Sequence, residues 1–152
     1  MLNQGDSAPD ARFETAMGAA SAKDYAGRKL VLYFYPKDDT SGCTREAQDF
    51  TALAKEFAAA NTEIVGISKD SLASHAKFTT KYDLKVKLGS DAEGSVCEAF
   101  GTWVEKSMYG RKYMGIERAT FLIGTDGKIA RIWRKVKVPG HAAEVLEAAQ
   151  AL

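Results

Sequence analysis

The sequence predicts an α/β fold in which a central mixed β-sheet is flanked by helices on both faces. A continuous apolar run over residues 30–35 is rich in β-forming residues and ends at Pro36, which is typical of a strand buried on both faces of a parallel sheet. Further along, Asp126-Gly127 lies between two β-rich runs and predicts an antiparallel hairpin. Parallel strands joined by helices, followed by a hairpin, give a mixed sheet.

Apolar periodicity and turn signals place the elements along the chain. In chain order, we expect two weak strands around a turn at 17–19, a strand at 30–35, a helix over 44–60, a strand at 64–67, a helix from 71, a brief strand at 86–88, a short helix at 95–100, a hairpin of 119–123 with 129–138, and a last helix over 142–152. This order fits a thioredoxin-like fold with an N-terminal extension through about residue 28. By its length we expect residues 1–152 to form a single domain.

The composition argues against several classes of protein. Of the 152 residues, 45% are hydrophobic and 27% are charged, which is the globular range and not that of a disordered chain. The formal net charge of +1 argues against a dedicated nucleic-acid binder. No apolar run approaches the ~20 residues of a membrane span, and the first residues lack the pattern of a signal peptide. We therefore expect a cytoplasmic protein with no nucleic-acid or membrane partner.

Cys43 is the residue whose position points most clearly to chemistry. It follows a polar loop, residues 37–42, and lies where the next helix begins. Ligands of α/β sheets bind outside the carboxyl ends of parallel strands, and a helix N-terminus offers unpaired N–H groups and partial positive charge. The unpaired N–H groups and the partial positive charge both favour the thiolate over the thiol, and the thiolate is the nucleophilic form of cysteine. Because cysteine is also common as an inert core residue, the position alone leaves both interpretations open.

Spacing excludes several other cysteine chemistries. A Cys-x-x-Cys dithiol would need a second cysteine where Glu46 stands, and a Cys-x5-Arg phosphatase loop would need arginine where Asp49 stands. The cysteines and histidines are scattered without the spacing of ligand pairs, so we expect no metal site. His75 is expected to be solvated on a surface helix, and His141 to begin the last helix.

Three segments resemble a known family. Residues 33–47, Tyr-Phe-Tyr-Pro-Lys-Asp-Asp-Thr-Ser-Gly-Cys-Thr-Arg-Glu-Ala, resemble the active-site segment of the peroxiredoxins, most closely the bacterioferritin comigratory protein (PrxQ) subfamily. Residues 108–123 and 133–141 resemble two further blocks of that subfamily, so the resemblance spans nearly the whole chain. It implies a thiol-dependent peroxidase that reduces hydrogen peroxide and organic hydroperoxides. It also implies a monomer without metal, haem or flavin cofactor, recycled by thioredoxin or a similar thiol protein.

The resemblance implies a role for each site residue. Cys43 matches the peroxidatic cysteine, which attacks the peroxide and becomes a sulfenic acid. Thr40 matches a threonine that contacts sulfur and peroxide, and Arg118 matches an arginine that favours the thiolate and binds the transition state. Pro36 matches a proline that shields the sulfur, and Glu46 a glutamate that orients the arginine. Apart from the resemblance, Thr40 reads equally well as a helix cap and Arg118 as a surface charge.

The chain departs from the subfamily at the resolving cysteine, the thiol that condenses with the sulfenic acid. Many members carry it five positions after the first cysteine, where this chain has Gln48. Cys97 is the only other thiol, and a disulfide with Cys43 would need the two Cα atoms within about 7 Å. We expect Cys97 to be the resolving thiol, which requires the start of the helix at Cys43 to unwind. The alternative is that Cys97 is a core residue and an outside thiol reduces the sulfenic acid. A thiol–disulfide oxidoreductase and a non-catalytic thioredoxin-like binding domain are the rival functions.

Overall fold

The computed structural model describes residues 1–152 and has the mixed α/β architecture that the sequence predicts. In chain order its elements are β1 (Phe13–Thr15), β2 (Gly18–Ala20), the 3-10 helix η1 (Ala22–Tyr25), β3 (Lys29–Phe34), α1 (Ser41–Ala52), α2 (Ala54–Ala59), β4 (Thr62–Ser68), α3 (Leu72–Tyr82), β5 (Lys87–Ser90), α4 (Ser95–Ala99), β6 (Trp103–Met108), β7 (Arg111–Ile116), β8 (Ala119–Ile123), β9 (Ile129–Trp133) and α5 (His141–Ala151).

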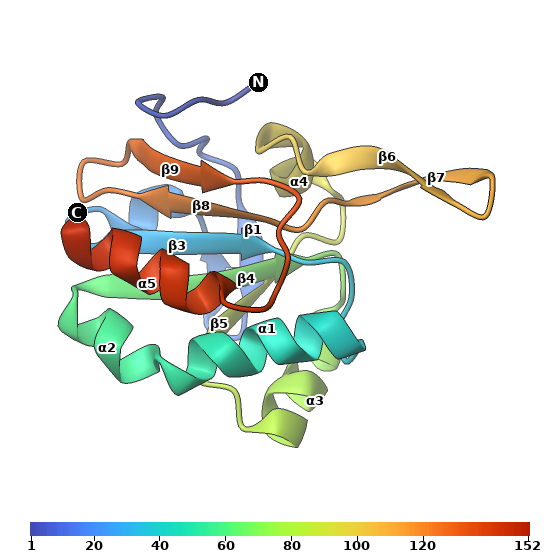
Figure 1. Cartoon of the computed structure of the whole chain (residues 1–152), viewed down its shortest axis with the longest axis horizontal. Helices are drawn as coiled ribbons and strands as arrows, with labels where there is room; N and C mark the ends of the chain where they lie inside the picture. The colour runs from blue at the N-terminus through green and yellow to red at the C-terminus, as the bar shows by residue number, and fades with distance from the viewer.

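Seven strands form a mixed sheet in the order β2-β1-β5-β4-β3-β8-β9. The pairs β3·β4 and β4·β5 are parallel, whereas β8 runs antiparallel to β3 and to β9 (Figure 1). The strand β3 is buried, as the apolar run predicts, and it lies between a parallel neighbour, β4, and an antiparallel one, β8. Its carboxyl end opens onto the polar loop before α1.

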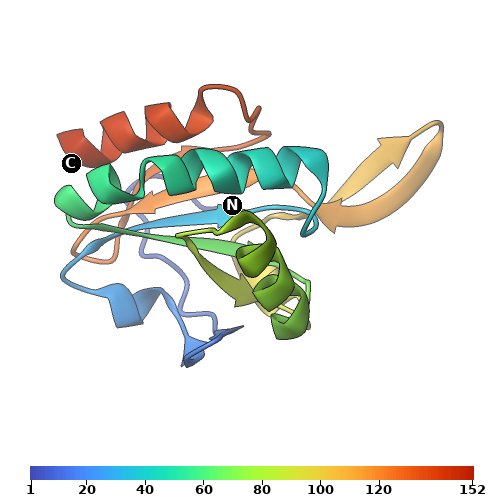
Figure 2. The same ribbon diagram turned by 90° about the horizontal axis from the view of Figure 1, so that it is seen from below.

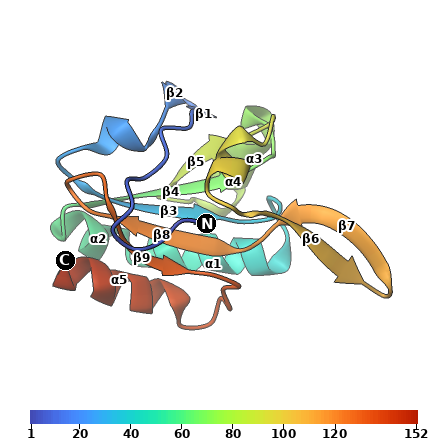
Figure 3. The same ribbon diagram turned by 90° about the horizontal axis from the view of Figure 1, so that it is seen from above.

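Side chains that alternate along β3 build a separate apolar core on each face of the sheet. Val31, Tyr33 and Tyr35 belong to a core formed with α1, α2, α5 and one side of α3. Leu30, Leu32 and Phe34 belong to a second core closed by η1, α4 and β1. Figure 2 shows α1, α2 and α5 packed together on one side of the sheet, and Figure 3 shows α4 toward the other side, with β1 and β2 at the edge of the sheet.

The hairpin β6–β7 is an element that the sequence pattern did not predict. It forms its own two-stranded sheet and projects away from the body of the molecule (Figure 1). Its turn has positive φ at Tyr109 (52°) and at Gly110 (78°), the pattern of a tight hairpin turn. Such turns are recognised in a sequence by Asn-Gly or Asp-Gly, so tyrosine at the first position hid this one.

Two predicted boundaries were wrong. The helix expected over 44–60 begins at Ser41 and is interrupted at Leu53, so it forms α1 and α2. The strand expected over 129–138 ends at Trp133, and the chain then leaves the sheet, with positive φ (48°) at Lys135. The earlier start of α1 matters for the site, because it places Cys43 within the first helical turn. None of the helices has the length and apolar character that crossing a membrane requires.

Candidate active site

Cys43 is the third residue of α1, just beyond the carboxyl end of β3. Its side chain is a free thiol and only 2% of the residue is exposed. Arg118, in the short link between β7 and β8, donates from Nη2 to Cys43 Sγ across 3.3 Å. Residues 75 positions apart in sequence thus bring a guanidinium to a thiol at the start of a helix. The sulfur thus faces a fixed cation and lies in the first turn of a helix.

Glu46 holds that guanidinium from the opposite side. One turn after Cys43 in α1, its Oε1 accepts from Arg118 Nη1 at 2.8 Å, and its side chain is 1% exposed. Gly42 contributes by lacking a side chain, because a Cβ there would lie 3.2 Å from Arg118 Nη2. The structure therefore brings together three of the predicted site residues, Cys43, Glu46 and Arg118.

Burial and charge act in opposite directions on this ion pair. Burial raises the pKa of Glu46 to about 7, although the charge and hydrogen bond of Arg118 pull it down. Burial alone would lower the pKa of Arg118, but the charges of Glu46 and Cys43 raise it overall. Arg118 consequently stays protonated beside the sulfur.

Thr40 and Pro36 lie on the loop that leads to Cys43. Thr40 is the N-cap of α1, but its hydroxyl donates to the carbonyl of Lys37 at 2.8 Å and makes no hydrogen bond to Cys43 Sγ. Pro36 follows the end of β3 and is exposed. The structure therefore puts both residues in the segment before the cysteine without joining either to the sulfur by a hydrogen bond.

Cys97 lies in the other core. It is a free, fully buried thiol in α4, packed with residues on the face of the sheet opposite to the core that contains Cys43. Its backbone N–H donates to Asp91 Oδ2 at 2.8 Å. Burial, reinforced by Asp91, raises the pKa of the Cys97 thiol to about 12. In this conformation Cys97 is a buried thiol on the opposite side of the sheet from Cys43.

The prediction for His75 was wrong. It is 3% exposed instead of solvated, with Nδ1 2.7 Å from Asp38 Oδ2 and Nε2 3.0 Å from the carbonyl oxygen of Gly89. The buried face of α3 runs through His75 and Phe78, whereas the apolar Leu72 is 40% exposed. A hydrophobicity pattern assigns a histidine to the polar face of a helix. It cannot show that the fold supplies a buried carboxylate as a partner for the histidine.

Lys106 is a further charged residue near the site that the sequence did not reveal. It lies on β6, within the hairpin that the pattern missed. Burial lowers the pKa of Lys106, and the nearby charge of Arg118 lowers it further, while Cys43 opposes the change. Only knowledge of the hairpin's path could have placed this cation beside Arg118.

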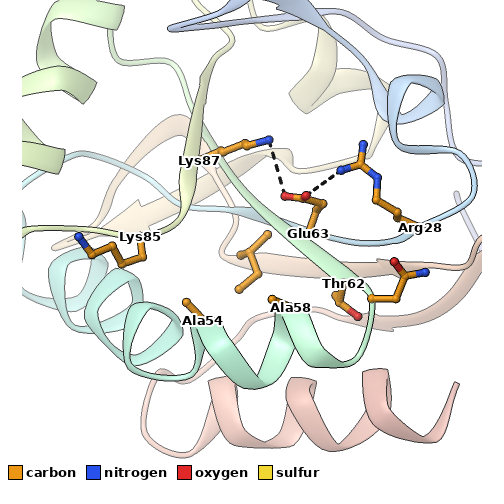
Figure 4. Close-up of a pocket in the computed structure, with 9 residues that line it drawn as sticks. Arg28, Ala54, Ala58, Thr62, Glu63, Lys85 and Lys87 are labelled. Atoms are coloured by element: carbon orange, nitrogen blue, oxygen red, sulfur yellow. Dashed lines mark hydrogen bonds and ion pairs between the residues drawn. The ribbon is translucent and has the colours of Figure 1, made fainter.

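A groove on another part of the surface is separate from this site. It has a volume of about 240 Å³ and lies where β4 begins, beside α2, whereas Cys43 lies beyond the carboxyl end of β3 (Figure 4). Because β3 and β4 are parallel, the two places are at opposite ends of the strands. Glu63 in the groove is already paired with Arg28 at 2.7 Å and with Lys87 at 3.6 Å.

Comparisons with known proteins agree on one family. The model of the AhpC/TSA family matches residues 4–132. Peroxiredoxin Bcp of Bacillus subtilis is 46% identical over 144 residues, which cover 94% of this chain and 92% of that protein. The solved structure of bacterioferritin comigratory protein from Xanthomonas campestris superimposes with a TM-score of 0.90 at 43% identity, covering 99% of this chain and 96% of that one. PrxQ of Xylella fastidiosa gives a TM-score of 0.93 at 40% identity, with coverage of 99% and 97%.

Proposed function

The chain belongs to the AhpC/TSA family and is a thiol-dependent peroxidase, and from that premise we propose that Cys43 is the residue that attacks the peroxide. The observation that carries the proposal is the 3.3 Å contact between Arg118 Nη2 and Cys43 Sγ in the first turn of α1. The same contact separates this function from a non-catalytic binding domain, which would have no need of a buried guanidinium on a thiol. The single thiol at the helix start argues against a dithiol oxidoreductase.

In the proposed reaction the Cys43 thiolate attacks one oxygen of the peroxide and the O–O bond breaks. The sulfur is oxidised by two electrons to the sulfenic acid, and the departing oxygen takes a proton and leaves as water or an alcohol. Arg118 donates to the sulfur and to the charge that develops on the oxygens, and Glu46 holds Arg118 in place. The Thr40 hydroxyl exchanges its hydrogen bond to the carbonyl of Lys37 for one to the peroxide. Pro36, which is exposed, forms the outer rim of the peroxide site.

Alkyl hydroperoxides are a proposed substrate class beside hydrogen peroxide. The Xanthomonas campestris relative is described by its alkyl peroxide reduction activity, and this chain matches it over nearly its whole length. We also propose that residues 1–152 act as one domain, as a monomer in the cytoplasm, with thioredoxin or a similar thiol protein as the reductant. The seven-stranded sheet, which joins β1 and β2 near the start of the chain to β8 and β9 near its end, supports the one-domain part of this proposal.

Two routes for reducing the sulfenic acid differ in what must move. If Cys97 condenses with it, water is released and a disulfide forms, but α1 and α4 must both open because the two thiols are buried in opposite cores. If an outside thiol attacks instead, only the surroundings of Cys43 must open. The full burial of Cys97 favours the second route, in which an outside thiol reduces the sulfenic acid, over an intramolecular disulfide.

The first test is the intact mass of the protein after one equivalent of hydrogen peroxide. Wild type should react, and Cys43→Ser should not; peroxide turnover by Cys43→Ser at the wild-type rate would overturn the proposal. If wild type loses the mass of two hydrogens while Cys97→Ser gains the mass of an oxygen, Cys97 is the resolving thiol. If both proteins gain an oxygen, the sulfenic acid is reduced by an outside thiol.

Arg118→Ala tests the contact that carries the proposal. Removal of a charge-assisted hydrogen bond to the transition state should slow Cys43 oxidation by about 10²–10³-fold, as measured in a single turnover by stopped flow. Arg45→Ala is the matched control, because Arg45 is an arginine two residues after Cys43 in α1 but is exposed and pairs with Asp49 at 3.5 Å. Equal rates for the two variants would mean that Arg118 takes no part in the reaction.

A further inference from the structure

The loop that leads to Cys43 is tied to α3 by a buried carboxylate. Asp38 is 7% exposed and accepts three hydrogen bonds, from Tyr35 Oη at 2.6 Å, Ser74 Oγ at 2.8 Å and His75 Nδ1 at 2.7 Å. Two of these donors belong to α3, and the third belongs to the chain directly after β3. A carboxylate with so many donors is held in one position.

The ring of His75 is placed to be a cation. Its Nδ1 faces the Asp38 carboxylate and its Nε2 faces the carbonyl oxygen of Gly89 on β5, so each nitrogen meets an acceptor and must carry a proton. Burial lowers the pKa of His75, but the hydrogen bond and charge of Asp38 raise it overall. Burial raises the pKa of Asp38, but His75 and Tyr35 lower it overall. The pair is therefore a buried imidazolium and carboxylate.

Two further contacts fasten the same loop. The backbone N–H of Asp38 donates to Asp70 Oδ2 at 2.8 Å, and Ser68 Oγ donates to the same oxygen at 2.7 Å. The next residue, Asp39, takes a positive φ of 58° and its carboxylate accepts from Lys81 Nζ at 2.8 Å. Consecutive residues of the loop thus connect to both ends of α3, although only the first connection is buried.

We propose that the Asp38–His75 pair is a clamp by which α3 positions the first turn of α1, and that release of this clamp is the step that exposes Cys43. The inference rests on the proposed function, because it concerns the same cysteine. Only four residues separate Asp38 from Cys43, and within them the Thr40 hydroxyl bonds only to Lys37 of the same loop. The clamp is the last buried attachment of the chain before the cysteine.

The clamp has opposite effects on the two halves of the reaction. Attack on the peroxide needs Cys43 held against Arg118, and a clamp that holds the loop favours it. Reduction of the sulfenic acid needs the buried sulfur to meet a second thiol, and the clamp opposes that. A positioning role therefore predicts that weakening the pair slows the first step and speeds the second, whereas loss of general stability would not separate the two steps in this way.

Charged groups around His75 determine how pH acts on the clamp. Asp38 and Asp70 face it from the loops, and Tyr35 Oη lies 3.5 Å from Nδ1 on the side of β3. On the open side, Asp24 and Lys87 line the same groove as His75. The clamp should hold between the lowered pKa of Asp38 and the raised pKa of His75, and open above the latter.

The test compares Asp38→Asn with Ser71→Ala. Ser71 caps the same helix, since its side chain accepts from the backbone N–H of Ser74 at 3.1 Å, but its hydroxyl makes no hydrogen bond to the side chain of Asp38 or His75. In Asp38→Asn, Cys43 oxidation by peroxide should slow by about tenfold and the reaction of the sulfenic acid with dithiothreitol should accelerate, since a hydrogen bond to a charged group is lost. In Ser71→Ala both rates should stay within about twofold of wild type.

Ser74→Ala keeps the test decisive if Asp38→Asn does not fold. It removes one of the three donors to Asp38 and should shift both rates in the same directions by a smaller factor. NMR titration of His75, one of only two histidines in the chain, should show its pKa lowered in Asp38→Asn. Both rates falling together, or neither changing, in Asp38→Asn and Ser74→Ala would overturn the clamp. Failure of wild-type Cys43 to react with peroxide would instead overturn the proposed function.

Discussion

Glu46 has one carboxylate oxygen on Arg118 and the other buried without a partner. Burial raises its pKa to about 7 against the pull of Arg118, whereas in the unfolded chain a glutamate titrates near 4.3. Between these two values the folded protein binds the extra proton. The contribution of Glu46 to stability is therefore greatest in acid and is lost as pH rises toward 7.

Glu46→Gln removes this titration while keeping an oxygen that can accept from Arg118. The free energy of unfolding of the variant, relative to wild type, should rise by on the order of 1–3 kcal/mol between pH 5 and pH 8. Urea unfolding at several pH values measures it. Glu56→Gln, at an exposed position of α2, is the control for the loss of a glutamate as such. A pH-independent difference for Glu46→Gln would contradict the raised pKa.

The neighbouring strands β3 and β4 pack closely because a glycine on one strand leaves room for a tyrosine ring on the other. Tyr33 of β3 and Gly66 of β4 are directly paired, and a Cβ at position 66 would lie 2.6 Å from Tyr33 Cζ and 2.7 Å from Tyr33 Oη. Tyr33 cannot move away easily, because it is fully buried and its ring stacks on Phe50 of α1 at a centroid distance of 4.8 Å. Gly66 thus makes room for the ring on which α1 rests.

Gly66→Ala should destabilise the protein by ~1–3 kcal/mol through overpacking. Because the displaced ring supports α1, the oxidation of Cys43 should also slow. Gly115→Ala is the matched control: it too lies in a strand, β7, but its methyl would meet the flexible side chain of Lys106 at 3.2 Å. Urea unfolding of both variants measures the difference, and equal costs would show that the Tyr33 contact is not the cause.

Elements were predictable where local pattern and tertiary environment agree. The apolar run of β3, the Asp126-Gly127 turn and the start of the helix bearing Cys43 carry their own signals, and the resemblance added the partners Arg118 and Glu46. The projecting hairpin was not predictable, since Tyr109 adopts the positive φ usually left to Asn or Gly. The burial of His75 was not predictable either, because a hydrophobicity pattern treats histidine as polar and only the folded chain brings Asp38 beside it.

The stability of the whole molecule also depends on a second buried histidine, His141. Its contribution changes with pH in the opposite direction to that of Glu46. His141 begins α5, where its Nε2 lies 2.8 Å from Thr120 Oγ1, and burial lowers its pKa to about 4. An unfolded histidine titrates near 6.5, so between these values the unfolded chain binds the extra proton. The stability that His141 contributes is therefore present above pH 6.5 and is lost as pH falls toward 4.

The opposing slopes of Glu46 and His141 cover nearly the same pH range, so they should cancel in the intact protein. We expect the free energy of unfolding of wild type to vary by only ~1 kcal/mol between pH 5 and pH 7, although each group alone would change it by about 2–3 kcal/mol. His141→Gln keeps a hydrogen-bond partner for Thr120 but does not titrate. This variant should gain stability on acidification because Glu46 then acts unopposed, while Glu46→Gln should lose it, and the double variant should be flat again. Urea unfolding of the four proteins at pH 5 and pH 7 measures all three trends, and parallel curves would show that the two buried groups do not titrate in opposite senses on folding.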